Sequence, residues 1–220
     1  ITTGMYGSYF SSVATDAAGN IYAAGIQRGI DNYSYGPGVS ATSTSNDINA
    51  VLVKYDPSGN ALWARAISNG TEYSNYSGVA VDANGNVYVA GGQGGRGTFH
   101  YGSGVFLTGV TIGWNPTLVK FDSNGNALWA KGLVSSNGSD SAFQTIKIDN
   151  QGNVYVAGLE GAGYFDYGNG SSVTASAGQN LVIVKYDSNG NAIWARTSSS
   201  SISTGAKGLA IDANGDVIVI

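Results

Sequence analysis

Few residues in this chain could carry acid–base or nucleophilic chemistry. His100 is the only histidine and there is no cysteine, so a metal site of several histidines or thiolates is impossible and a Ser-His-Asp triad would depend on His100 alone. Glu160 and Asp166 are close in sequence and could form the carboxylate pair of a glycosidase if their separation in space allowed it. The sequence therefore favours a non-enzymatic protein without metal or cofactor. A polysaccharide-acting enzyme that uses loop carboxylates is the alternative.

Much of the chain is a repeat, and a unique active centre should lie among the residues that differ between copies, because shared residues serve a need of every copy. The residues of chemical interest that do not recur are Arg28, Asp31, Asp47, Glu72, Arg96, His100, Trp114, Asp140, Glu160 and Asp166. His100 takes the position held by Ser34 and Asp166 in other copies, which is typical of a variable loop position. Trp114 is a candidate ligand-binding residue.

Three tyrosines recur in a glycine-rich segment. The stretches "YSYGPG" at 33–38, "FHYGSG" at 99–104 and "FDYGNG" at 165–170 place Tyr35, Tyr101 and Tyr167 at intervals of 66 residues. This pattern predicts a small extra hairpin. Exposed tyrosines on such a hairpin could stack on sugar rings or dock a protein, which makes these three candidate ligand-binding residues. In the alternative, the rings pack down on the outer edge of the sheet.

Six of the ten basic residues also recur at fixed places: Lys54, Lys120, Lys185, Arg65, Lys131 and Arg196. One interpretation is a ring of charge that binds anions. The other is a lattice in which each residue pairs with a neighbouring unit, since largely buried charges are normally paired. The lattice is the expected arrangement.

Two phrases alternate along the chain. The first reads "VATDAAGNIYAAG" at 13–25 and recurs at 79–91, 146–158 and 209–220. The second reads "LVKYDPSGNALWAR" at 52–65 and recurs at 118–131 and 183–196. The aspartates Asp16, Asp82, Asp149 and Asp212 of the first phrase are 66, 67 and 63 residues apart, and Asp56, Asp122 and Asp187 of the second are 66 and 65 apart. Both phrases therefore belong to one unit of about 66 residues.

Each phrase predicts a β-hairpin, because apolar residues alternate on both sides of an Asp-x-x-Gly turn. The aspartate can accept a backbone N–H bond two residues on, and the glycine takes the left-handed conformation of a type I turn with a G1 bulge. An EF-hand loop would need a terminal Glu that is absent, so turn geometry explains these aspartates without calcium.

The turns also predict the pairing of the strands. In the first hairpin of the second unit we expect Val81 opposite Val87 and Val79 opposite Val89. In the second hairpin of the first unit we expect Val53 opposite Trp63, Val51 opposite Arg65 and Lys54 opposite Leu62. The recurring tryptophans are expected to anchor the packing, since a buried indole contributes up to about 4–6 kcal/mol; they are Trp63, Trp129 and Trp194.

Four short strands per unit, apolar on both faces, predict a β-propeller with four-stranded antiparallel blades. A β-solenoid of three coils per unit is the competitor, and the lack of similarity at about 22 residues argues against it. The chain forms one propeller region over 1–220, with units at about 12–77, 78–144 and 145–207 and an extra hairpin at 208–220.

The two phrases in fixed order resemble the bacterial beta-propeller repeats of SBBP type and are more loosely similar to NHL-type repeats. The resemblance covers nearly the whole chain. It implies a propeller on an extracellular or surface protein and supplies no catalytic residues to transfer.

Composition narrows the partners. The net charge of −4 gives no positive field for phosphates, so nucleic acid is excluded as a partner. No apolar run approaches the roughly 20 residues that cross a bilayer. Abundant Gly, Ser, Thr and Asn with few lysines favour an extracellular or cell-surface location. We expect a structural or assembly role, or binding of a protein or glycan.

We expect both the first and the last residue of the sequence to fall inside a repeat unit. Ile1 aligns with the end of a fourth strand, and Ile220 falls inside a second strand. We therefore expect either the remainder of a longer chain or another copy to complete the ring, since a closed propeller needs about four to eight blades.

Overall fold

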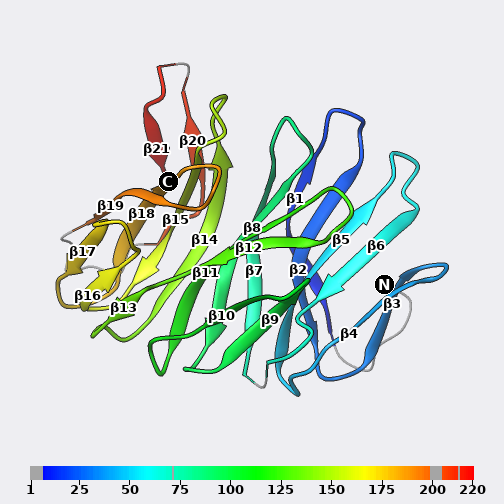
Figure 1. The fold of residues 1–220 in the computed structure, drawn as a ribbon, viewed down its shortest axis with the longest axis horizontal. Coiled ribbons are helices and arrows are strands. Elements are labelled where there is room, and N and C mark those ends of the chain that lie inside the picture. Colours follow the sequence, from blue (N-terminus) through cyan, green and yellow to red (C-terminus); the bar gives the residue numbers. More distant parts are fainter. Residues whose placement is uncertain (1–6, 71, 199–204, 213) are drawn as a thin grey trace.

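The structure is a computed structural model that describes residues 7–70, 72–198, 205–212 and 214–220 (Figure 1). It holds three four-stranded antiparallel sheets and a last hairpin. The first sheet has the order β1 (Tyr9–Thr15), β2 (Ile21–Arg28), β5 (Ile48–Tyr55), β6 (Ala61–Ala66). The second contains β7 (Ser74–Val81), β8 (Val87–Gly94), β11 (Trp114–Phe121) and β12 (Ala127–Lys131), and the third contains β14 (Ser141–Ile148), β15 (Val154–Glu160), β18 (Asn180–Tyr186) and β19 (Ala192–Thr197). The last hairpin pairs β20 (Leu209–Ile211) with β21 (Val217–Val219).

This arrangement confirms the prediction of an all-β chain built from repeated four-stranded antiparallel sheets. Each unit forms a sheet of its own, so the stacked coils of a solenoid are not its architecture. The first strands of successive sheets contact each other, β1 with β7 and β7 with β14. In addition, β7 packs on β2 and β5 of the first sheet, and β14 packs on β8 and β11 of the second. Closure into a ring and the number of blades stay predictions. No helix in the described residues is long and apolar enough to cross a membrane.

The predicted extra hairpin is present in every unit between its second and third strands. These hairpins are β3 (Asn32–Gly36) with β4 (Val39–Thr42), β9 (Thr98–Gly102) with β10 (Val105–Thr108), and β16 (Gly163–Asp166) with β17 (Ser172–Ala175). We call them the inserted hairpins. Each packs on the outer strand of its own sheet, where β4 contacts β6, β10 contacts β12 and β17 contacts β19.

Inserted hairpins also pair with the segment that arrives from the preceding sheet. The short strand β13 (Ser135–Ser136) follows the second sheet and pairs with β16 of the third unit. In the same way, Asn69 forms an isolated bridge with His100 of β9. In both of these connections the backbone is therefore hydrogen-bonded to the next unit, and these bonds link the successive sheets.

A single aspartate organises each turn. In the first hairpin of the second unit, Asp82 Oδ1 accepts the N–H groups of Asn84 and Asn86, both at 2.9 Å. Gly85 donates its N–H to Asp82 O at 3.0 Å and has a φ of 79°, a value at which only glycine is unstrained. The other turn aspartates accept the same two bonds; they are Asp16, Asp56, Asp122, Asp149, Asp187 and Asp212.

The predicted register is confirmed in the first hairpin and wrong in the second. Val81 pairs with Val87 and Val79 with Val89, as expected. In the second hairpin of the first unit, however, Lys54 pairs with Trp63 and not with Leu62. A bulge beside Tyr55 absorbs Leu62, which is 48% exposed, and shifts every later pair by one residue. The same irregularity recurs after Lys120 and Lys185, so lysine and tryptophan face each other across the strands.

The shifted register directs the lysine and tryptophan toward the next unit. Lys54 Nζ donates to Ser123 O at 3.1 Å, and Trp63 Nε1 donates to the same oxygen at 3.2 Å. Arg65 Nε donates to Gly125 O at 2.8 Å. Lys120 repeats the contact one unit later, with 3.1 Å to Ser188 O. The lattice expected for these residues is present, but its acceptors are turn carbonyls rather than carboxylates.

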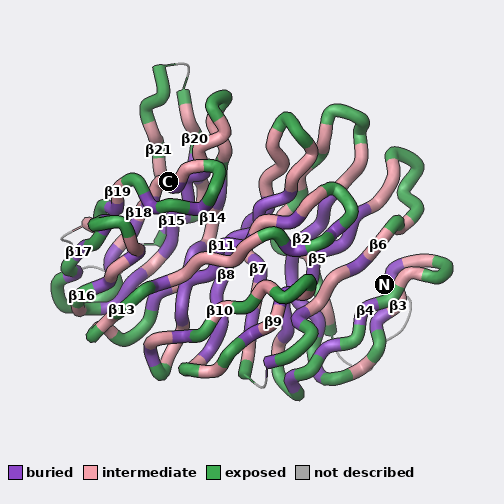
Figure 2. Tube along the Cα trace, viewed as in Figure 1, coloured by how far each residue is buried: buried purple, intermediate pink, exposed green. Residues whose placement is uncertain are grey.

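The tryptophans are half-buried, so they contribute less than the upper bound for a fully buried indole. Each packs against a tyrosine of its own sheet, with ring centroids 6.0 Å apart for Trp63 and Tyr22 and 5.8 Å for Trp129 and Tyr88. The lysine ammonium lies over the tyrosine ring, 5.0 Å from the Tyr22 centroid for Lys54. Buried residues follow the centres of the sheets, and the turns are exposed (Figure 2).

The lattice predicts unequal roles for two lysines that occupy equivalent positions. Lys54 is 8% exposed and binds the Ser123 carbonyl, whereas Lys185 stacks on Tyr155 at 4.9 Å and makes no carbonyl bond to a described residue. A charged hydrogen bond contributes about 1.5–3 kcal/mol. We expect Lys54→Met to lower the free energy of unfolding by about 1–2 kcal/mol more than Lys185→Met, as measured by urea denaturation. Equal effects of the two variants would show that the carbonyl bond adds no stability.

Candidate functional site

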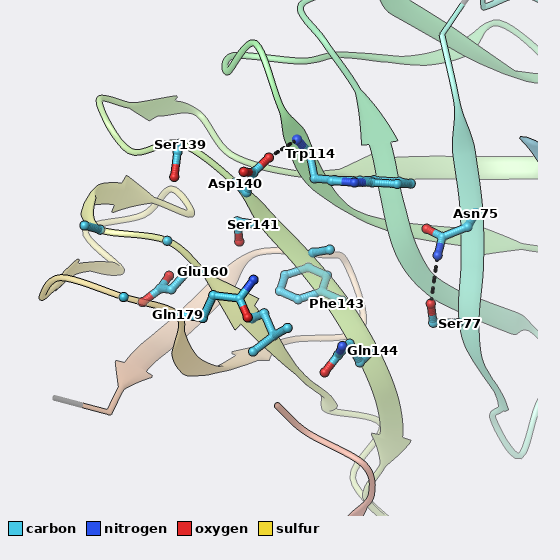
Figure 3. Close-up of a pocket in the computed structure, with 15 residues that line it drawn as sticks. Asn75, Ser77, Trp114, Ser139, Asp140, Ser141, Phe143, Gln144, Glu160 and Gln179 are labelled. Carbon is cyan, nitrogen blue, oxygen red and sulfur yellow. Dashed lines mark hydrogen bonds between the residues drawn. The ribbon is translucent and has the colours of Figure 1, made fainter. Parts of the chain in front are cut away.

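A pocket of about 520 Å³ opens between the second and third sheets (Figure 3). Its walls come from β7 and the start of β11 on one side and from β14 and the end of β15 on the other. The polar and aromatic residues that line it are Asn75, Ser77, Trp114, Ser139, Asp140, Ser141, Phe143, Gln144, Glu160 and Gln179. The pocket therefore combines an indole and a phenyl ring with amides, hydroxyls and two carboxyl groups.

Three residues that do not recur between the units meet in this pocket: Trp114, Asp140 and Glu160. They come from three different places in the sequence and were singled out there only by their failure to repeat. The other non-recurring residues, including His100 and Asp166, are not among the described residues that line it. The pocket is thus a place where the chain departs from its own repeat.

Asp140 fixes the backbone at the start of β11. Its Oδ1 accepts the N–H of Trp114 at 2.7 Å, and its own carbonyl accepts the N–H of Gly161 at 2.6 Å. A side chain at position 113 would collide with the Asp140 carboxylate, so Gly113 is what admits the carboxylate there. One exposed aspartate thereby links the second sheet to the third.

Asp140 takes a position that an aromatic residue holds in the second unit. Gly161 N bonds Asp140 O as Gly94 N bonds Tyr73 O, so Tyr73 holds the equivalent position in the second unit. The Tyr73 ring packs on Trp114 of its own sheet with centroids 4.4 Å apart. Asp140 instead bonds the Trp114 backbone of the preceding sheet. In the first unit the equivalent of Trp114 is Ile48, which pairs with Arg28 as Trp114 pairs with Gly94.

Negative charge gathers around the aromatic pair. Burial raises the pKa of Tyr73, and the charges of Asp140, Glu72 and Asp47 raise it further. No lysine or arginine is among the described residues that line the pocket, and residues 1–6, 71, 199–204 and 213 contain none in the sequence. The pocket consequently disfavours phosphate, sulfate and carboxylate ligands.

Glu160 replaces a buried glutamine of the other units. Gln93 Oε1 accepts the Tyr101 hydroxyl at 2.6 Å and its Nε2 donates to Leu107 O at 3.1 Å. Glu160 keeps the first contact, because its Oε2 accepts the Tyr167 hydroxyl at 3.2 Å. Its Oε1 is enclosed and has no hydrogen-bond partner among the described residues.

The environment of Glu160 favours its neutral form. The side chain is 1% exposed, and burial raises its pKa to about 7, although the neighbouring hydroxyls of Thr197 and Tyr167 lower it. A protonated carboxyl has one donor, as the glutamine amide does at the equivalent position. Glu160 therefore acts as an imperfect glutamine below neutral pH and as a buried carboxylate above it.

The tyrosines predicted to bind ligands do not lie in this pocket. Tyr35, Tyr101 and Tyr167 are 6%, 4% and 4% exposed, so the expectation of exposed rings is wrong. Each hydroxyl bonds a buried side chain, as when Tyr35 donates to Gln27 Oε1 at 2.6 Å. The inserted hairpin holds each ring against its own sheet because the apolar rings gain more by burial than by exposure.

The other candidates for chemistry are also dispersed. Asp166 Oδ1 accepts the N–H of Gly168 at 2.8 Å and lies outside the pocket that Glu160 lines, so the two carboxyls do not share it. The His100 ring lies 5.8 Å from Phe106. The described residues include no group of three metal-binding side chains. Sequence reasoning missed Asn75, Gln144 and Gln179; alignment of Glu160 with Gln27 and Gln93 was the one available signal for its burial.

Replacement of Glu160 by glutamine should make stability less dependent on pH. The folded pKa of about 7 lies above the ordinary 4.5, so the unfolded state releases its proton first and stability falls as pH rises from about 4.5 to 7. The difference amounts to at most about 3 kcal/mol above pH 7. We expect Glu160→Gln to be more stable than the unmodified chain at pH 8 and equal to it at pH 4, by urea denaturation. A constant difference across this range would contradict the raised pKa.

Comparison with known proteins supports the architecture and gives no activity. No family model matches the chain, so membership of the SBBP-type family stays a prediction. A protein described as uncharacterized WD repeat-containing protein L264, from Acanthamoeba polyphaga mimivirus, is 28% identical over 207 residues. The match covers 80% of this chain and 15% of that protein, so the chain spans a small part of its relative.

A solved structure of a protein of unknown function from Bacteroides caccae aligns with a TM-score of 0.42 and 16% identity, over 97% of this chain and 70% of that one. At that score the likeness does not define a shared fold. The repeated four-stranded sheets and the similarity to a WD-repeat protein together support a repeat-based, propeller-like fold.

Proposed function

We propose that this chain is a non-catalytic binding module of propeller type that uses the pocket between its second and third sheets. The observation that carries the proposal is the meeting of Trp114, Asp140 and Glu160 in one pocket of about 520 Å³. Elsewhere the units repeat one another, so a local departure that opens a cavity is the best candidate for selected function. The composition favours an extracellular or cell-surface setting for it.

The lining suits a polar ligand with a flat face. Trp114 provides apolar surface, since Phe143 behind it is fully buried. Polar side chains of Asn75, Gln144 and Ser77 line the rest of the pocket. Such a combination serves a sugar ring or a polar side chain of a protein, because an aromatic residue packs on the C–H face while amides bond the hydroxyls. A glycan or a protein segment is therefore the proposed partner.

An enzyme that acts on polysaccharide is the second candidate, and Glu160 is the reason. A carboxyl with a pKa of about 7 is suited to be a general acid, and Asp140 lines the same pocket. Against catalysis, Glu160 Oε2 already accepts the Tyr167 hydroxyl and Oε1 is enclosed by protein atoms. A substrate oxygen would have no route to either atom in this arrangement, so binding without turnover is the better account.

Assembly with a further repeat is part of the same proposal. Lys185, Trp194 and Arg196 reproduce the residues with which Lys54, Trp63 and Arg65 hold the next turn. Trp194 packs on Tyr155 and Arg196 lies over Trp194 at 5.8 Å, so these side chains are already arranged as in the first unit. Another repeat, from the remainder of a longer chain or from another copy, would supply the turn carbonyls that this face lacks among the described residues.

Substitution of Trp114 tests the binding role. On a glycan array we expect retention of one or more polar glycans by the unmodified chain, and at least a tenfold loss of affinity in Trp114→Ala, since the indole forms the main apolar wall. Phe106→Ala removes a ring that is 59% exposed outside the pocket and should leave binding unchanged. Hydrolysis of an arrayed glycan that disappears in Glu160→Gln would favour the enzyme instead. Equal binding by Trp114→Ala and the unmodified chain would remove the pocket from consideration.

A further inference from the structure

The Trp114 pocket has an electrostatic character that goes beyond a general polar site. Asp140 is exposed at the pocket and uses Oδ1 for the Trp114 N–H. Glu72 and Asp47 lie near enough to Tyr73 to influence its ionisation together with Asp140. Asp140 is the one of these three carboxylates that lines the cavity, and no basic side chain is among its described lining residues.

Aromatic faces and carboxylates favour the same kind of ligand. The face of an indole attracts a cation within about 6 Å of its centre, by about 0.5–2 kcal/mol according to exposure. A carboxylate beside the ring adds a charge-assisted hydrogen bond to an N–H donor. Neutral hydroxyls gain neither of these charge interactions, and anions are repelled.

Glu160 shapes the wall of the same pocket without being open to a ligand. Glu160 is 1% exposed, lines the pocket and has an Oε1 with no partner among the described residues. The equivalent atom in Gln93 is a donor that bonds Leu107 O. The substitution therefore replaces a satisfied donor by an acceptor in the wall of the pocket that contains Trp114.

We propose that the pocket binds a ligand carrying a primary ammonium group on a hydroxylated ring, with the ammonium between the Trp114 face and the Asp140 carboxylate. This inference rests on the proposed function, because it names the ligand class for the same site. Asn75 and Gln144 line the same pocket. Their amide oxygens already accept the N–H groups of Gly92 and Ala206, so they would meet the ring hydroxyls through their amide N–H groups. An amino sugar has this chemistry.

Three closely related sugars test the ammonium charge separately from the sugar-binding capacity of the pocket. D-glucosamine and D-glucose differ by an amine in place of one hydroxyl, and N-acetyl-D-glucosamine keeps the nitrogen without its charge. At about pH 6 the free amine is protonated. By calorimetric titration at low salt we expect glucosamine to bind at least about tenfold more tightly than either neutral sugar. Equal affinities for all three sugars, or no binding of glucosamine, would overturn the inference.

Two aspartate variants test whether the Asp140 carboxylate causes the preference for glucosamine. Asp140→Asn keeps an oxygen that can accept the Trp114 N–H and removes the charge, so the preference for glucosamine should fall to about threefold or less. Asp216→Asn makes the same change of net charge in the turn of the last hairpin and should leave the preference intact. An unchanged preference in Asp140→Asn would also refute the inference.

The outcomes separate this inference from the proposed function. If Trp114→Ala weakens all three sugars while the unmodified chain does not distinguish them, the pocket binds and the ammonium preference is wrong. If no sugar of the three binds and the glycan array detects another ligand that Trp114→Ala loses, the ammonium inference fails and the binding role stands. Thermal unfolding of each variant confirms that the sheets are intact.

Discussion

The aspartate turn is the constraint on which the rest of this structure depends. One carboxylate accepts two backbone N–H groups, and a glycine with positive φ closes the loop. This geometry sets which residues face each other along the hairpin, and a shift of one residue would move every side chain to the opposite face. Because all seven turns share it, every sheet presents the same surface to its neighbour.

The repeated surface then determines how the sheets associate. The bulge beside Tyr55 brings Lys54 opposite Trp63, and both donate to one carbonyl in the turn of the next unit. Backbone carbonyls are present whatever side chain occupies the turn, so this contact tolerates change in the turn sequence. Inserted hairpins add a second connection, since those of the second and third units pair with the segment that arrives from the preceding sheet. Local turn chemistry and long-range packing thus reinforce each other.

The sequence predicted the features that residues adjacent in the chain determine. It did not predict the features that depend on packing against another strand or sheet. Asp82 and Gly85 define a turn by themselves, so the pairing of Val81 with Val87 followed from the sequence. The position of Leu62 in a bulge depends on how the lysine and tryptophan fit the next sheet, and alternation alone did not reveal it. Tyr101 was considered as an exposed ring, yet Gln93 supplies a buried partner for its hydroxyl that only alignment of the units could have indicated. Trp114, Asp140 and Glu160 were marked as exceptions to the repeat, but their meeting in one pocket is a property of the folded chain.

Lys54 reaches a carbonyl that lies 69 residues ahead, and Lys120 reaches one that lies 68 ahead. Because the stabilising contacts extend only to the adjacent unit, gain or loss of one whole unit preserves the contacts of all others. Change in length by whole units is therefore compatible with the local structure of the units that remain. A difference of several hundred residues between two members of one lineage would therefore be compatible with an unchanged local structure, whereas a deletion of half a unit would not.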